Sequence, residues 1–87
     1  MPYPNEHTAR ITSPSAYVRF RRKNIAPGVD VIFGIRKDGK TEIQTYRFDA
    51  KRFTVAQAKA WLAEHNVKYI LFEPAENREM NVRIRGQ

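Results

Sequence analysis

The sequence predicts a small α+β domain, in which one helix packs on one face of a mostly antiparallel β-sheet. Three observations predict this class. Apolar and polar residues alternate over several short stretches, an Asp-Gly pair joins two of these stretches, and a single later segment has helical spacing. A chain of 87 residues has the length of one domain. The expected order of elements is β-β-β-α-β-β.

The first sixteen residues are expected to form an irregular N-terminal arm. Pro2, Pro4 and Pro14 lie there among Ser, Thr and Asn, and this composition favours turns over regular elements. Residues 17–87 are then expected to form the single small α+β domain.

The first predicted strand covers residues 17–22, where side chains alternate. Val18 and Phe20 are expected to be buried beneath the helix, and Tyr17, Arg19 and Arg21 to lie on the other face. An Ala-Pro-Gly break follows at residues 26–28.

The next two strands are predicted to form a hairpin over residues 29–36 and 41–48. Both strands are rich in β-branched and aromatic residues. Asp38 and Gly39 lie between them, and both residue types tolerate a positive φ, which favours a tight turn.

The helix is predicted over residues 53–66. Thr54 is a suitable N-cap, and Gln57 three residues later completes a capping box. Asn66 can end the helix in a left-handed conformation. Five residues recur at helical spacing and form the predicted buried stripe: Val55, Ala58, Trp61, Leu62 and His65.

Two further strands are expected after the helix. Residues 68–73 form a buried strand that Pro74 ends. In the last strand Met80, Val82 and Ile84 alternate with polar residues, which is typical of a strand at a sheet edge.

The composition limits the classes of function. Sixteen Lys and Arg against nine Asp and Glu give a net charge of +7, and a polyanion is therefore a plausible partner. The absence of cysteine excludes disulfides and thiolate zinc sites. His7 and His65 are far apart and do not predict a metal site. No apolar run is long enough to span a membrane. We expect neither a cofactor nor a membrane partner.

The main functional hypothesis is nucleic-acid binding, without enzymatic activity, through an Arg- and Lys-rich sheet face. Cations would contact phosphates, and Tyr17 would stack on a base or sugar. The partner is expected to be nucleic acid or an acidic protein surface. The candidate binding residues are Arg19, Arg21, Arg22, Lys23, Lys40, Arg47 and Tyr17.

A metal-dependent nuclease is a further alternative. Asp30 on one strand of the hairpin, with Glu42 and Gln44 on the other, is similar to the metal-binding hairpin of the PD-(D/E)xK nucleases. Gln replaces the usual Lys, and the chain lacks the helix that normally precedes the motif.

Four segments together resemble a small protein family of tailed bacteriophages and prophages, encoded near or fused to head-maturation protease and capsid genes. These segments are residues 4–11, 20–24, 30–48 and 53–75. The resemblance implies a viral protein without assigned activity, located in the cytoplasm of the host cell or within a phage particle. It also implies the second alternative, a virion-associated or host-targeting interaction module that binds a phage or host protein and can inhibit a host factor.

Overall fold

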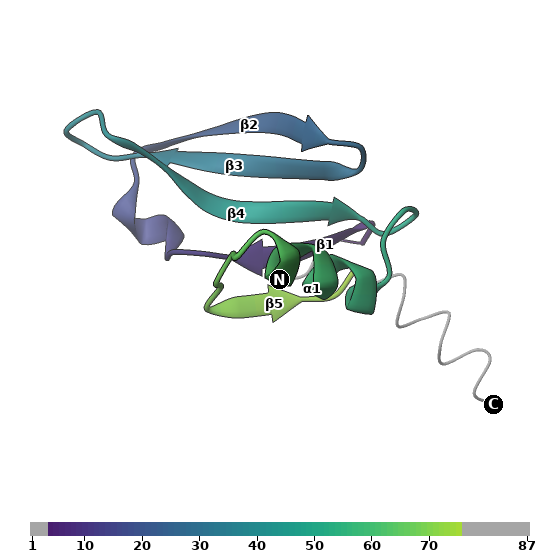
Figure 1. Ribbon diagram of the computed structural model, residues 1–87. Helices are drawn as coiled ribbons and strands as arrows, with labels where there is room; N and C mark the ends of the chain where they lie inside the picture. The colour runs from purple at the N-terminus through teal and green to yellow at the C-terminus, as the bar shows by residue number, and fades with distance from the viewer. Residues whose placement is uncertain (1–3, 76–87) are drawn as a thin grey trace.

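The computed structural model describes residues 4–75, and Figure 1 shows the five strands and the α-helix that they form. The predicted α+β class is confirmed. A short 3-10 helix, η1 (Pro14–Ala16), precedes the second strand. The other elements are β1 (Glu6–Arg10), β2 (Arg19–Ala26), β3 (Val29–Ile35), β4 (Thr41–Asp49), α1 (Val55–Glu64) and β5 (Leu71–Glu73).

The strands form one antiparallel sheet in the order β2-β3-β4-β1-β5. Strand β1 therefore lies inside the sheet, and the prediction that residues 1–16 are irregular is wrong for Glu6–Arg10. The short sequence of β1 has no alternation of apolar and polar residues. Its His7, Thr8 and Ala9 are nevertheless all buried, because β4 and β5 flank the strand on both sides.

The predicted hairpin turn between β3 and β4 is confirmed. The amide of Arg36 donates to the carbonyl of Lys40 over 2.8 Å, and the amide of Gly39 donates to the carbonyl of Arg36 over 2.8 Å. Gly39 has φ +92°, whereas Asp38 has no positive φ. This is a three-residue loop that ends in a left-handed glycine.

Helix α1 begins with the predicted capping box. The Thr54 hydroxyl accepts a hydrogen bond from the Gln57 amide over 3.1 Å, and the Gln57 side chain accepts one from the Thr54 amide over 2.9 Å. Asn66 follows the helix with φ +57°, as predicted. Within the described residues no helix is long and apolar enough to cross a membrane.

The core lies between α1 and one face of the sheet. Of the predicted helical stripe, Ala58 and Leu62 are fully buried, and Trp61 packs at the border of the core. His65 is exposed instead, with its ring stacked on Trp61 at a centroid distance of 3.8 Å. The core residues are Ala9, Val29, Phe48, Ala58 and Leu62.

Helix α1 covers only part of the sheet. In Figure 1 the β2–β3 hairpin lies on the side of the sheet away from α1. Val18 and Phe20, which were expected beneath the helix, are 61% and 47% exposed. That prediction is wrong because β2 is the edge strand farthest from β1 and β5 in the sheet order.

The predicted strand over residues 68–73 is shortened to Leu71–Glu73. The final strand predicted around Met80 to Ile84 lies outside the described residues.

Candidate interaction surface

The two faces of the sheet carry different parts of the predicted basic site. We call the face that packs against α1 the helix face and the other the open face. Lys23 lies opposite Val31, which shares the helix face with the core residue Val29 because residues two apart point the same way. Arg21 and Arg19 follow at steps of two. These three cations therefore share the helix face, and we call them the basic row.

The basic row has no acidic partner among residues 4–75. Beside it on the helix face, Phe33 and Ile43 lie opposite each other on β3 and β4 and are only half-buried. A hollow of about 340 Å³ lies between Phe33 and β2, and Arg21, Lys23 and Thr41 also line it. The helix face of strands β2 to β4 thus combines uncompensated positive charge with accessible apolar surface.

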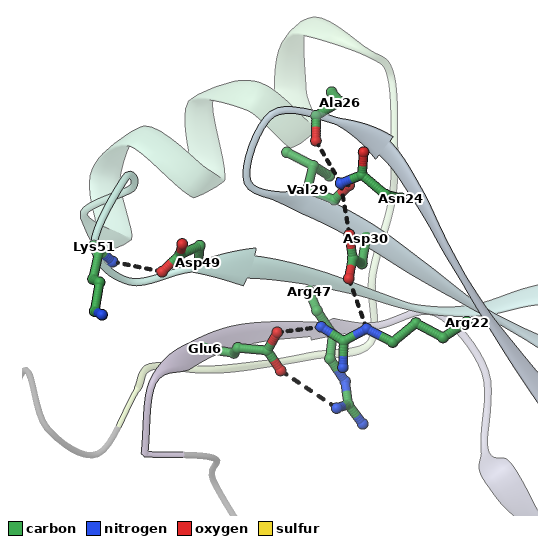
Figure 2. A network of polar contacts seen from close by, with 9 residues as sticks. All are labelled: Glu6, Arg22, Asn24, Ala26, Val29, Asp30, Arg47, Asp49 and Lys51. Atoms are coloured by element: carbon green, nitrogen blue, oxygen red, sulfur yellow. Dashed lines mark hydrogen bonds and ion pairs between the residues drawn. The ribbon is translucent and has the colours of Figure 1, made fainter.

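Arg22 points to the open face, where it is already engaged. Its Nε donates to Asp30 Oδ2 over 2.6 Å, and its Nη2 forms an ion pair with Glu6. Glu6 also pairs with Arg47 over 3.4 Å, and Asn24 donates to Asp30 Oδ1 over 2.8 Å. Figure 2 shows how this network links side chains from β1, β2, β3 and β4.

This network shifts the pKa values of two of its members, Arg22 and Asp30. Burial on its own lowers the pKa of Arg22, but the hydrogen bonds and negative charges of Glu6 and Asp30 raise it above its ordinary value. Burial raises the pKa of Asp30, whereas hydrogen bonds from Asn24 and Arg22 and the nearby cations lower it below its ordinary value. Asp30 and Arg22 are therefore held as a charged pair.

Tyr17 does not project outward as predicted, because it is only 7% exposed. Its ring covers Gly34, where an added Cβ would lie 2.4 Å from the ring carbon Cγ. The Tyr17 hydroxyl donates to Glu42 Oε1 over 2.9 Å and lies 2.6 Å from Thr12 Oγ1. Tyr17 therefore packs the open face of the hairpin and cannot stack on a ligand in this position.

The carboxylates of the nuclease alternative do not converge. Asp30 lies opposite Arg47, whereas Glu42 lies opposite Gly34, four residues farther along β3 and about 13 Å away. Hydrogen bonds from Arg36 and then from Tyr17 lower the pKa of Glu42. No group of three metal-ligating side chains occurs in the described part of the chain.

Gln44, the third residue of the nuclease pattern, has a structural role. Its Nε2 donates to the carbonyl of Thr12 over 2.7 Å, and its Oε1 accepts from the Thr45 hydroxyl. Gln44 lies at the irregularity where the register between β3 and β4 shifts. It therefore ties the segment after β1 to the sheet.

The single basic face that we predicted is wrong in its geometry. Arg19 and Arg21 lie on the helix face, whereas Arg47 lies on the open face beside Glu6. Lys40 directly follows the three-residue hairpin loop, seven residues from Arg47 and about 23 Å away along β4. Only part of the predicted set, the basic row, remains as one uncompensated group.

His7 is a buried residue whose role the sequence analysis missed. It is fully buried, and its Nδ1 accepts from the Ala75 amide over 2.9 Å. Its Nε2 lies 2.8 Å from the Phe53 carbonyl, which can only accept. His7 is therefore a neutral imidazole with its proton on Nε2. Nothing in the local sequence of β1 indicates this, because both partners are distant in the chain.

Gly34 and its contact with Tyr17 were also missed, although a signal was present. A glycine inside a predicted strand indicates a close approach by another part of the chain. The glycine indicates where the close approach occurs but not which residue makes it. In the structure the Tyr17 ring packs against Gly34.

Comparison with known proteins gives one match. A family model described as "BRX: Transcription factor regulating root and shoot growth via Pin3" matches residues 21–71, more than half of the chain. No curated protein and no solved structure matches this chain.

The family match overturns four predictions. It shows that the resemblance to a phage family is wrong, and with it the viral assignment and the placement in a host cell or phage particle. It also overturns nucleic-acid binding as the main functional hypothesis and favours the protein-interaction alternative. The division of the basic residues between two faces agrees with this correction. The matched segment begins within β2 and ends at Leu71, the first residue of β5, and it includes β3, β4 and α1. The chain belongs to the BRX family.

Proposed function

We propose that this protein is a non-enzymatic interaction module that binds an acidic, extended segment of a partner protein along β2. The observation that carries the proposal is the basic row, which lies at a free sheet edge without an acidic partner among residues 4–75. BRX domains mediate protein–protein interactions, which supports a protein as the partner.

Strand β2 has the form that strand addition requires. It is eight residues long, it contains no proline, and all of its residues except Ala26 are exposed. An edge strand presents unpaired backbone N–H and C=O groups along one side, and an extended segment can pair with them. The backbone supplies the binding energy that is common to any such segment, and the side chains supply the selectivity.

The side chains of β2 select an acidic segment. An added strand would place every second residue opposite Arg19, Arg21 or Lys23 on the helix face. Opposite charges in directly opposed positions contribute about 0.2–1 kcal/mol per pair, and like charges destabilise the pairing. A second β2 strand would set cations against cations, whereas a strand with Glu or Asp at alternate positions would form three favourable pairs.

A synthetic peptide tests the proposal. The probe is a fluorescein-labelled peptide as long as β2 in which Glu and Thr alternate, and binding is measured by fluorescence anisotropy. The triple variant Arg19→Glu, Arg21→Glu, Lys23→Glu should weaken binding by about tenfold or more, which corresponds to three cross-strand pairs. The control variant Lys51→Glu, Arg52→Glu, Lys68→Glu has the same charge and changes only exposed residues. It should bind within about twofold of the unmodified protein.

A second peptide separates strand addition from simple charge attraction. It carries the same number of Glu residues, with Pro in place of Thr, and cannot form the backbone ladder. Equal binding of the two peptides would contradict strand addition. Failure of the Glu-Thr peptide to bind at low salt would contradict the proposal as a whole.

A further inference from the structure

The open face of the sheet contains a hollow of about 780 Å³, lined by residues from all five strands. Such a volume falls in the range of sites for small ligands. Arg22 and Arg47 line one side of it, next to the ion pairs with Glu6 that Figure 2 shows. Two members of the basic row, Arg19 and Lys23, do not line this hollow, whereas Arg21 contributes to its lining beside Phe20 and Arg22.

The Thr8 hydroxyl in this hollow is buried and has no hydrogen-bond partner among the described residues. Thr8 is 5% exposed. A buried polar group without a partner lowers the stability of a fold, and such groups are rare in proteins. Thr8 lies between Arg47 on β4 and Glu73 on β5, opposite both in the strand register. The hydroxyl is a donor available to a ligand that enters the hollow.

Arg10 supplies an available positive charge next to this hydroxyl. It follows Thr8 by two residues on β1, so the two side chains share the open face about 7 Å apart at their bases. Arg10 is half-buried, and its side chain makes no hydrogen bond or ion pair with residues 4–75. The acidic lining residue Glu73 has an interaction of its own. This end of the hollow therefore favours a single negative charge.

The other end of the hollow is apolar. Phe20 is 47% exposed and lines the hollow from β2, and the half-buried Ile32 lines it from β3. The Phe20 ring is held in place by an edge contact with the buried Tyr17 ring, at a centroid distance of 6.0 Å. An apolar ligand group would cover both side chains and remove their surface from water.

We propose that this hollow binds a monocarboxylate carried on an apolar body. The carboxylate accepts hydrogen bonds from the Arg10 guanidinium and from the Thr8 hydroxyl, and the apolar body packs against Phe20 and Ile32. The planar Arg10 guanidinium matches a planar carboxylate, and its positive charge beside Thr8 balances the negative charge of the ligand. The ligand is either a free small acid or the same group at the end of a peptide chain.

An NMR titration of the whole protein with 3-phenylpropionate tests the site. We expect saturable shifts of the amide signals around Thr8, Arg10 and Phe20, with a Kd of about 1 mM for so small a ligand. The neutral 3-phenylpropionamide has the same shape and should bind about tenfold more weakly or not at all. Arg10→Gln should weaken binding of the acid by about tenfold, whereas the exposed Arg52→Gln should not change it.

Thr8→Val distinguishes a ligand site from a purely structural role. Val fills the same space without the buried hydroxyl, so the variant should be as stable as the unmodified protein or more stable. Its affinity for 3-phenylpropionate should nevertheless fall severalfold. A peptide that ends in a free Phe carboxylate, compared with its amidated form, shows whether a chain terminus binds more tightly than the free acid.

Several results would overturn this inference. The absence of saturable shifts with 3-phenylpropionate would do so, and so would equal binding of the acid and the amide. Shifts centred on Arg19 and Lys23, which do not line the hollow, would show attraction to the basic row and would equally exclude the site. Unchanged affinity in Thr8→Val would remove the hydroxyl from the binding site and contradict the proposed arrangement.

Discussion

The half of the sheet that α1 covers and the half formed by the β2–β3 hairpin are stabilised in different ways. Under the helix, Phe48 and Leu62 are fully buried in an apolar core. In the hairpin half, the Tyr17–Gly34 contact and the ion pairs of Arg22 hold the open face, while Phe33 and the basic row on the helix face stay accessible. Apolar burial secures the first half, and local contacts secure the second, which leaves a strand edge available for a partner.

The largest loss of unfolding free energy should come from a substitution in the half of the sheet that α1 covers. Leu62→Ala creates a cavity in the core and should lower the free energy of unfolding by about 2–5 kcal/mol. Phe33→Ala removes a half-buried side chain of the β2–β3 hairpin and should cost less, about 1–2 kcal/mol. Urea unfolding followed by circular dichroism measures both. Equal losses would show that the two halves do not differ as described.

A smaller effect is expected from Gly34→Ala in the hairpin half. The new methyl group would lie 2.4 Å from Tyr17 Cγ, and the displacement of the buried ring should cost about 1–3 kcal/mol. In a Tyr17→Ala background the same substitution should cost much less, because the ring is absent. An unchanged cost in that background, measured by the same unfolding experiment, would exclude the clash as its cause.

The smallest effect concerns the ion pair of Asp30. Its pKa is lowered in the folded protein, so the ionised carboxylate stabilises the fold above the unfolded pKa of about 3.9. This contribution is lost as the pH falls through the lower folded value. Asp30→Asn should therefore cost up to about 1 kcal/mol at pH 6, since the pair is partly exposed, and almost nothing near pH 2.

Unfolding experiments at the two pH values check the last expectation. Glu64→Gln is a matched control, because Glu64 is exposed on α1 and makes no ion pair with residues 4–75. A loss in Asp30→Asn that stays the same at both pH values would show that the charge of Asp30 is not its source.

Local patterns predicted much of the fold. The Asp38-Gly39 turn, the capping box of Thr54 and the left-handed Asn66 depend on neighbouring residues, and all three were predicted. Strand β1 was missed, because its burial depends on β4 and β5, which are distant in the sequence. Alternation also showed which residues of β2 share a face, but it could not show which face α1 covers.

The candidate site was predicted less completely for a related reason. The sequence places Arg19, Arg21, Arg22 and Lys23 in one basic run, and nothing in the run distinguishes them. The fold separates Arg22 from the others, because the pleat turns it to the open face, where residues of other strands neutralise it. A count of charges along a strand therefore overestimates the charge that is available to a partner.

The position of β1 shows that the folded domain begins at Glu6 or earlier, whereas the family match begins at residue 21. The matched segment, residues 21–71, omits β1, yet β1 lies between β4 and β5 and pairs with both. Residues 11–75 without β1 would therefore leave a strand-wide gap between β4 and β5. Residues 6–10 act as a donor strand supplied by the same chain, and His7 fastens Ala75 beside it. The chain can therefore be divided into two fragments for a complementation experiment. One fragment contains the sheet without β1, and the other is a short peptide that contains β1 and completes the sheet.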